Sequence, residues 1–374
     1  MKLSRSYAGI FLLATLATGC SNNPQKTLVE LSIPNSMIEN ESEKLYFYEE
    51  GVETPIDSVD IPASEPNASD RVVKHELSAD TTKRIIASYS DLFIYLFSEP
   101  GTVKGNLKTD FSVRGTTLND EFAEFESTLQ KEMEPLQLKA EMTKREDTLT
   151  DRQKDSVYMS LENEEEALAA RMYSDVNSKH LNDILGAVLL EESYALLTPQ
   201  QFIDFTNKSS DVVKKYPKMQ DLITITKNAL ATSEGKPYQE VTGIDPKNEK
   251  ELKLSQFVKP GNYTIVDFWA SWCGPCRREI KVLQNIYNKY KNQKFQIVGI
   301  AIWDETSKTL QAIDKLGIQW PIIFQHAERT NKKEHKYGIS AIPTLILIDP
   351  NGTILVRSHS SDEIEKILKE AFEK

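Results

Sequence analysis

The sequence predicts a chain of several domains, in which a small β-rich domain and a helical segment precede an α/β domain at the C-terminal end. Three observations predict this order. Short runs rich in β-branched and aromatic residues fill positions 27–115 and are typical of strands. Apolar residues at helical spacing dominate 116–232, and strand and helix signals alternate from 233 to 374. The length of 374 residues agrees, because a domain usually has roughly 100–200 residues.

The β-rich region, 27–115, is interrupted by prolines and glycines, which favour loops over regular structure. Between these interruptions lie segments with the composition of short β-strands. We therefore expect a small β-rich domain with strands at 28–31, 44–48, 91–97 and 111–113.

The helical region, 116–232, begins with a start signal. Asn119 is a good N-cap residue, and Asp120 and Glu121 after it would interact favourably with the positive end of a helix dipole. Apolar residues around 181–196 mark a second helix that is more buried.

A further helix is expected from the pair Thr198-Pro199. Threonine caps a helix well, and proline at the first helical position loses no hydrogen bond. The helical pattern runs to about Ala231, and Gly235 and Pro237 end it.

Negative charge is concentrated in residues 120–166, which hold 15 acidic and 6 basic side chains. A solvated helix face explains such a run, and we prefer this interpretation. The alternative is an acidic surface on which a partner docks.

The C-terminal region, 233–374, alternates apolar strands with amphipathic helices and has a hairpin near its end, with the turn at 349–352. This is a βαβ arrangement. Strands are expected at 264–268, 295–302, 344–348 and 354–356, and helices at 307–316 and 362–372. A further helix carries Ile280, Leu283, Ile286 and Tyr290 on one face.

The composition narrows the possible functions. Hydrophobic residues make up 39% and charged residues 27%, which is ordinary for a protein with real cores. The net charge of −11 argues against a surface for nucleic acid or anionic lipid. Three cysteines are too few for a disulfide scaffold, and no cofactor motif is present. We expect no nucleic-acid partner and no bound cofactor.

The first twenty residues have the pattern of an export signal, with Lys2 and Arg5 before an apolar stretch too short to stay in a bilayer. The stretch ends in Ala17-Thr18-Gly19-Cys20, which resembles the lipobox of bacterial lipoproteins. That resemblance implies a signal peptide at 1–19, lipidation of Cys20 and a tether at 20–26. The alternative is a plain secretory signal with Cys20 as an incidental thiol.

The segment Trp272-Cys273-Gly274-Pro275-Cys276 follows a predicted strand and opens a predicted helix. The free N–H groups and the dipole of a helix start favour a thiolate at Cys273. Cys276 would lie one turn inside the helix, where it can attack a mixed disulfide formed by Cys273. Half of a zinc site has the same spacing, but no further cysteine remains outside the leader, and His326, His335 and His359 lack matching spacing.

Residues 266–276, from Val266-Asp267-Phe268 to Cys276, resemble the active-site segment of thioredoxin. With the export leader and Ala341-Ile342-Pro343-Thr344, residues 238–374 resemble the TlpA/ResA branch of membrane-anchored thiol–disulfide oxidoreductases. The resemblance implies a thioredoxin-like α/β fold for the domain at 233–374. It also implies a redox-active disulfide between Cys273 and Cys276.

The same resemblance assigns roles to other residues. Pro343 carries over as a cis proline, beside which the backbone of Ile342 would pair with an extended substrate. Asp267 carries over as the buried acid that takes the proton from Cys276. The substrate would meet the exposed side of the disulfide, formed by Trp272, Gly274 and Pro275.

Some residues near the motif have plainer interpretations. Trp269 is expected in the core, and Arg277 and Arg278 are expected in solvent, although they could favour a thiolate. Peroxiredoxin chemistry is the nearest competing enzyme activity, but Ala270 and Val266 stand where that family has Thr or Ser and Pro.

We therefore expect a lipid-anchored enzyme on the periplasmic face of the cell envelope that reduces disulfides of exported proteins. Its partners would be protein thiols and disulfides and a membrane protein that donates electrons. One alternative is an envelope binding or scaffold lipoprotein whose upstream domains carry the main role. Another is a disulfide oxidant or isomerase.

Overall fold

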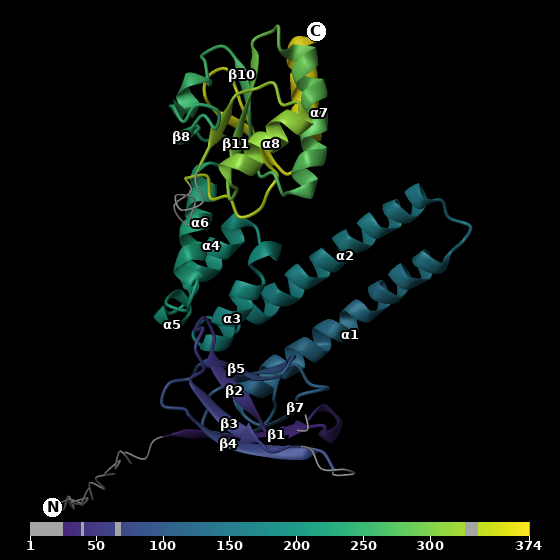
Figure 1. Cartoon of the computed structure of the whole chain (residues 1–374), viewed down its shortest axis with the longest axis vertical. Coiled ribbons are helices and arrows are strands. Elements are labelled where there is room, and N and C mark those ends of the chain that lie inside the picture. The colour runs from purple at the N-terminus through teal and green to yellow at the C-terminus, as the bar shows by residue number, and fades with distance from the viewer. Residues whose placement is uncertain (1–24, 39–40, 64–68, 326–335, 374) are drawn as a thin grey trace, which may run out of the picture. The chain divides into compact units, whose positions relative to one another are not determined.

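The computed structural model describes residues 25–38, 41–63, 69–325 and 336–373. The predicted signal peptide and the predicted lipidation site, Cys20, lie outside them. The chain divides into two compact units, Met1–Glu124 and Phe125–Lys374, and the division falls within helix α1 (Thr117–Arg145). Figure 1 shows the elements in chain order. The domain boundaries predicted at 115/116 and 232/233 stay predictions.

The N-terminal unit is built from two β-sheets around one shared core. The three-stranded sheet has the order β4-β1-β7 and the four-stranded sheet has the order β3-β2-β5-β6. Apolar side chains alternate along the strands, as in Val29, Leu31 and Ile33, so one face of each sheet is buried. The strands are β1 (Lys26–Ile33), β2 (Glu43–Glu49), β3 (Asp57–Ile61), β4 (Arg71–Ser78), β5 (Arg84–Tyr89), β6 (Leu92–Phe97) and β7 (Gly101–Asn106).

The predicted strands at 28–31, 44–48 and 91–97 are confirmed as β1, β2 and β6, but the strand predicted at 111–113 is wrong. That segment follows β6 only through an isolated bridge, in which Tyr95 N–H donates to Phe111 O and Val113 N–H donates to Tyr95 O. Two such bonds are too few to form a strand. The sequence analysis also missed β3, β4, β5 and β7.

Helix α1 begins at Thr117, so the prediction that Asn119 caps this helix is wrong. The Asn119 side chain is buried instead. Its Oδ1 accepts from Phe97 N at 2.8 Å, and its Nδ2 donates to Phe97 O at 2.9 Å. These two bonds tie the first turn of α1 to the end of β6.

The acidic stretch 120–166 lies on α1, on the following turn and on α2 (Asp151–Asn177). None of its acidic residues is buried, so the predicted solvated helix face is confirmed. The acidic docking surface is not needed to explain this charge and stays a prediction.

Four shorter helices follow: α3 (Ile184–Glu192), α4 (Pro199–Lys208), α5 (Asp211–Lys214) and α6 (Met219–Ala231). The buried helix predicted around 181–196 is α3, and Thr198 caps α4 by accepting from Gln201 N, as predicted. The single helical pattern expected up to Ala231 is interrupted, because Lys218 follows Pro217 and has a left-handed φ of 66°.

The C-terminal part of the second unit is a seven-stranded sheet of order β14-β13-β10-β11-β12-β8-β9 with helices packed on it. Strands β10, β11 and β12 run parallel, and the other neighbours are antiparallel. The predicted α/β class is confirmed. Its elements are β8 (Thr242–Ile244), β9 (Glu251–Lys253), β10 (Tyr263–Trp269), α7 (Gly274–Tyr290), β11 (Phe295–Ala301), α8 (Thr306–Leu316), β12 (Ile322–Phe324), β13 (Thr344–Ile348), β14 (Ile354–Ser358) and α9 (Asp362–Phe372).

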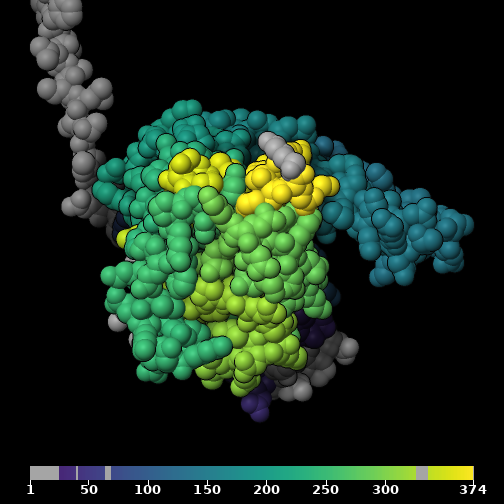
Figure 2. All heavy atoms as spheres, turned by 90° about the horizontal axis from the view of Figure 1, so that it is seen from above, coloured from purple at the N-terminus to yellow at the C-terminus, as the bar shows by residue number. Residues whose placement is uncertain are grey.

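The two faces of this sheet have separate cores, and β10 supplies both. Ile265 and Trp269 belong to the core shared with α7, α8 and α9, whereas Val266 and Phe268 belong to the opposite core. Side chains alternate along a strand, so Asp267 points to the same face as Ile265 and Trp269. Figure 2 shows α9, in yellow, beside α7, in green. No helix in the described ranges is long and apolar enough to cross a membrane.

Candidate active site

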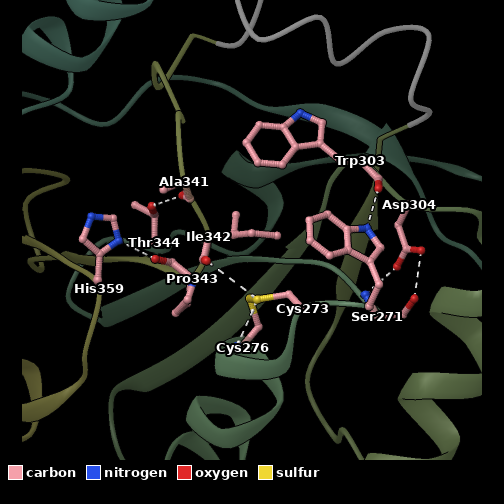
Figure 3. The surroundings of a disulfide bond; sticks show 11 residues. Ser271, Cys273, Cys276, Trp303, Asp304, Ala341, Ile342, Pro343, Thr344 and His359 are labelled. Carbon is pink, nitrogen blue, oxygen red and sulfur yellow. Dashed lines mark hydrogen bonds between the residues drawn. A yellow bond between two sulfur atoms is a disulfide. The ribbon is translucent and has the colours of Figure 1, made fainter. Parts of the chain in front are cut away.

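Two cysteines lie where strand β10 passes into helix α7. Cys273 is the N-cap residue of α7, and its Sγ accepts a hydrogen bond from Cys276 N at 3.1 Å. A disulfide joins Cys273 to Cys276, as Figure 3 shows. Only 4% of Cys273 and 1% of Cys276 is exposed to solvent. A substrate therefore reaches this disulfide at the Cys273 side.

The position of Cys273 determines its chemistry once the disulfide is reduced. The first N–H groups of a helix have no partner inside the helix, and here the N–H of Cys276 already points at the Cys273 sulfur. The helix dipole adds positive potential at the same place, so this environment favours a thiolate at Cys273. Cys276 lies in the first turn and is buried, and from there it can attack only a nearby sulfur.

The loop that faces the disulfide contains a cis peptide bond between Ile342 and Pro343. Its carbonyl groups are held from two sides: Thr344 Oγ1 donates to Ala341 O at 2.7 Å, and His359 Nδ1 lies 2.6 Å from Pro343 O. The Ile342 carbonyl oxygen is 3.7 Å from Cys273 Sγ. Among the described residues, neither the N–H nor the C=O of Ile342 makes a backbone hydrogen bond. Its backbone is thus available to an extended chain.

Asp267 lies within β10 and is fully enclosed by the core that also contains both cysteines. Its Oδ2 has no hydrogen-bond partner among the described residues. Burial, and after it the negative charge of Glu279, raises the pKa of Asp267 to about 8 from its ordinary value of 3.8. A carboxyl group with such a pKa exchanges a proton near neutral pH, which suits a general acid or base.

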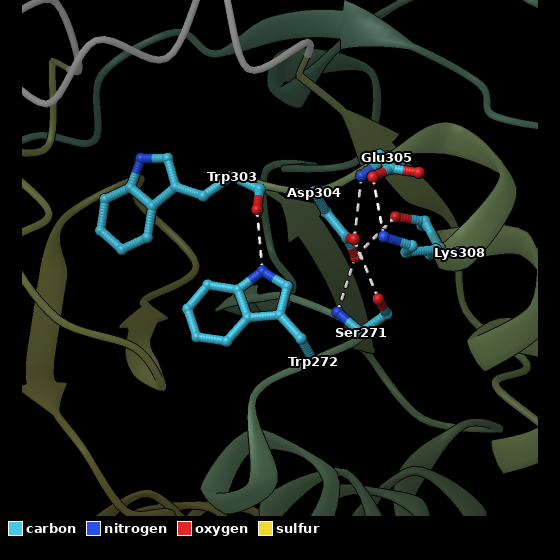
Figure 4. Close-up of polar contacts among 7 residues, drawn as sticks. Ser271, Trp272, Trp303, Asp304, Glu305 and Lys308 are labelled. Atoms are coloured by element: carbon cyan, nitrogen blue, oxygen red, sulfur yellow. Dashed lines mark hydrogen bonds and ion pairs between the residues drawn. The ribbon is translucent and has the colours of Figure 1, made fainter.

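A second carboxylate, Asp304, fixes the loop before the disulfide, and the sequence analysis missed it. Asp304 accepts from Ser271 N at 2.6 Å and from Ser271 Oγ, Glu305 N and Thr309 Oγ1 at 2.9 Å each (Figure 4). Its only sequence signal is its place in the loop after strand β11, three residues beyond Ala301, because loops often carry site residues.

The residue before Asp304, Trp303, orients the side chain of Trp272. Its indole Nε1 donates to Trp303 O at 2.8 Å, although 60% of Trp272 is exposed. Trp303 adopts a left-handed φ of 55°. The exposed indole is therefore held in a fixed position next to Cys273 in the sequence.

A shallow cleft of about 400 Å³ begins beside the disulfide. Pro275 and Glu279 of α7 line one side, and Ile342, Pro343 and His359 line the other. Arg278 also lines this cleft, and Gly274 and Pro275 are exposed at its start. The structure thus brings together the predicted residues of α7 and of the cis-proline loop.

Other predicted positions are distributed as follows. Trp269 is fully buried, Arg277 is half-buried and Arg278 is exposed. His326 and His335, considered for zinc, lie outside the described residues. Within the described ranges, no group of three or more His, Cys, Asp or Glu side chains could hold a metal ion.

Comparisons with known families find similarity in the part of the chain that holds this site. Residues 235–357 match the model of the AhpC/TSA family, which is about a third of the chain. This is the region that carries the disulfide, the cis proline and the buried acid.

Particular relatives share one name, thiol-disulfide oxidoreductase ResA. The chain is 27% identical over 122 residues to the protein of Geobacillus kaustophilus, 25% over 112 residues to that of Bacillus subtilis and 31% over 107 residues to that of Oceanobacillus iheyensis. These matches cover 32%, 30% and 29% of this chain. The chain spans only 67%, 60% and 53% of the lengths of these curated relatives.

Solved structures with similar names also align with part of the chain. One is the thioredoxin domain of a thiol-disulfide oxidoreductase from Bacteroides vulgatus, at 27% identity and a TM-score of 0.34, covering 37% of this chain and 97% of that one. Another is a putative thiol:disulfide interchange protein DsbE from Chlorobium tepidum, at 26% identity and a TM-score of 0.33, also covering 37% and 97%.

Proposed function

We propose that this protein is a thiol–disulfide oxidoreductase that reduces disulfides of exported proteins through Cys273 and Cys276. The observation that supports this best is the position of the disulfide relative to the cis-proline loop. A disulfide at the N-terminus of α7 faces the unpaired backbone of Ile342, so a sulfur nucleophile and a binding edge for an extended chain lie together.

The proposed reaction begins with the reduced protein. The Cys273 thiolate attacks one sulfur of a substrate disulfide, and the other substrate sulfur leaves as a thiolate. Ile342 and Pro343 hold the substrate chain by backbone pairing. The product of this step is a mixed disulfide between Cys273 and the substrate.

Resolution follows inside the protein. The Asp267 carboxylate takes the proton of the Cys276 thiol, and Cys276 then attacks the Cys273 sulfur. The second substrate thiolate leaves and takes a proton. In total, two protein thiols become one disulfide, and one substrate disulfide becomes two thiols.

The protein must then be reduced again by two electrons and two protons. We propose that a membrane protein supplies them, and that lipid on Cys20 keeps this chain near that donor on the periplasmic face of the cell envelope. The export leader and its Ala17-Thr18-Gly19-Cys20 end support this location.

Turnover with a model substrate tests the activity. With excess dithiothreitol, we expect the purified protein to accelerate reduction of the disulfides of insulin, measured by the appearance of turbidity. The double variant Cys273→Ser/Cys276→Ser is the matched control and should reduce insulin no faster than dithiothreitol alone. Equal rates for the two proteins would refute the proposed activity.

The double variant also tests the scaffold alternative. If a cell that carries only this variant keeps the protein's full cellular role, the upstream regions carry that role and the redox proposal is wrong. If the role is lost while the variant is exported normally, the cysteine pair is required.

A further inference from the structure

A second cleft, of about 520 Å³, lies next to the cis-proline loop within the unit Phe125–Lys374. One wall comes from the helical region, from the segment around Tyr194 and from α4 and α6. The other wall comes from residues around Ala341, from Arg357 at the end of β14, and from His359 directly after that strand. Nothing in the proposed reaction uses this space.

The helical wall is fixed against the thioredoxin-like part. Gly338 has a φ of 55°, and a Cβ atom there would lie 2.1 Å from Ile225 O of α6, so the two backbones are in direct contact. Arg357 also bridges the two parts, donating to Thr232 Oγ1 at 3.2 Å and to Gly338 O at 3.3 Å. The cleft therefore has fixed walls.

The helical wall is mainly apolar and includes two aromatic rings. Tyr194 and Phe202 meet edge to face with centroids 4.9 Å apart, and Tyr194 Oη accepts from Thr226 Oγ1 at 3.3 Å. Leu222 of α6 is half-buried and also lines the cleft. Such a wall suits an apolar side chain.

The opposite wall carries one positive charge, the half-buried guanidinium of Arg357. Among the described residues, no carboxylate lies within ion-pair distance of it; Glu234 accepts from the Arg357 backbone N–H instead. A guanidinium has five N–H donors, and only two are used in the contacts to Thr232 and Gly338. The remaining donors suit a carboxylate, the partner that guanidinium binds in a forked geometry.

The cleft adjoins the active site. Ala341 and His359 line both this cleft and the shallow cleft beside the disulfide. Figure 3 shows His359 on the side of Pro343 away from the disulfide. A chain paired with the Ile342 backbone can thus extend past Pro343 and His359 to Arg357.

We propose that this cleft selects substrates: it binds a segment of the substrate protein that lies beyond its reacting cysteine. An apolar side chain of that segment contacts Tyr194, Phe202 and Leu222, and a neighbouring acidic side chain binds Arg357. The inference rests on the proposed function, because the occupant is the substrate of that same disulfide. It adds that the upstream helices take part in substrate choice.

Peptide substrates test this. Each peptide carries one cysteine in a mixed disulfide with 5-thio-2-nitrobenzoate, and a Leu-Glu pair is moved stepwise along either side of that cysteine. Control peptides carry Leu-Gln at the same positions. At one position, we expect the second-order rate constant for single-turnover reaction of the reduced wild-type protein to be about tenfold higher for Leu-Glu, the factor that corresponds to about 1.4 kcal/mol.

Variants then assign the preference to the cleft. Arg357→Gln should bring the ratio of the two second-order rate constants near one, whereas Arg357→Lys should keep part of the wild-type preference. Leu222→Glu adds a negative charge to the same cleft at a half-buried site and should invert the ratio, so the test survives if Arg357→Gln fails to fold. Lys281→Gln removes an exposed charge from α7 outside both clefts and should leave the ratio unchanged.

The outcomes separate this inference from the proposed function. If wild-type protein reduces both peptides equally at every position, or if Arg357→Gln and Leu222→Glu keep its preference, the inference is overturned and the enzyme activity stands. If wild-type protein reduces no peptide, the proposed function fails and this inference fails with it.

Discussion

Replacing Cys276 with serine is expected to leave the protein covalently joined to its substrates. Cys273 can still attack a substrate disulfide, because its position at the N-terminus of α7 is unchanged. Resolution then fails, since the described part of the chain holds no other thiol that could attack the mixed disulfide. Non-reducing gel electrophoresis of envelope extracts should show new adducts that dithiothreitol removes, and mass spectrometry should place them on Cys273.

Cys273→Ser is the matched control for this experiment, because it removes one sulfur of the same pair. We expect few or no adducts from it, since the remaining Cys276 is only 1% exposed. The assignment of roles would be contradicted if Cys273→Ser trapped substrates at Cys276 as well as Cys276→Ser does at Cys273. Adducts in neither variant would contradict the proposed exchange itself.

The second large effect is expected from Asp267→Asn, and it concerns stability before activity. The pKa of Asp267 is about 8 in the folded protein against an ordinary value of 3.8, so the folded state holds a proton that the unfolded state has lost. Between about pH 4 and pH 8 the unfolded chain therefore binds fewer protons than the folded chain. In this range the free energy of unfolding falls by up to about 1.4 kcal/mol for each unit by which the pH rises. Above pH 8 both states are ionised and this loss is complete.

Asparagine has a similar shape and no charge, so the variant should lose this pH dependence. We expect the free energies of unfolding of the two oxidised proteins to be similar near pH 4 and to differ by several kcal/mol near pH 8, with Asp267→Asn the more stable. Guanidinium chloride unfolding at a series of pH values measures this. Parallel curves for the two proteins would show that Asp267 ionises normally.

The same variant should slow the release of substrate. Without a group that takes the proton of Cys276, the mixed disulfide on Cys273 should persist longer, while the first attack keeps its rate. Glu279→Gln is a useful companion, because the charge of Glu279 is a cause of the raised pKa. It should lower the pKa of Asp267 and move the fall in stability to lower pH without removing it.

The chemistry of the pair could be predicted because its determinants lie close together in the sequence. Cys273 and Cys276 open α7 directly after β10, and both elements have strong apolar patterns. For the same reason β13 and α9 agree with their predicted ranges. A local pattern is enough where each element supplies its own buried face.

The rest of the site depends on contacts between distant segments. Asp304 holds Ser271 from 33 positions away, and His359 contacts Pro343 from the far side of a hairpin. The residues next to Asp304 and His359 in the sequence form no motif that would predict these contacts. The predicted helix cap at Asn119 is wrong for a related reason. The Asn119 side chain makes hydrogen bonds to the buried backbone of Phe97 instead of capping the helix.

The central claim is that Cys273 and Cys276 form a reversible couple poised to reduce other disulfides. The most direct test is the reduction potential of this couple, obtained by thiol trapping of the soluble protein in defined dithiothreitol buffers. We predict a value near that of thioredoxin, about −270 mV. A value of about −120 to −180 mV, where strong oxidants and isomerases lie, would contradict the proposed direction and indicate disulfide formation or rearrangement.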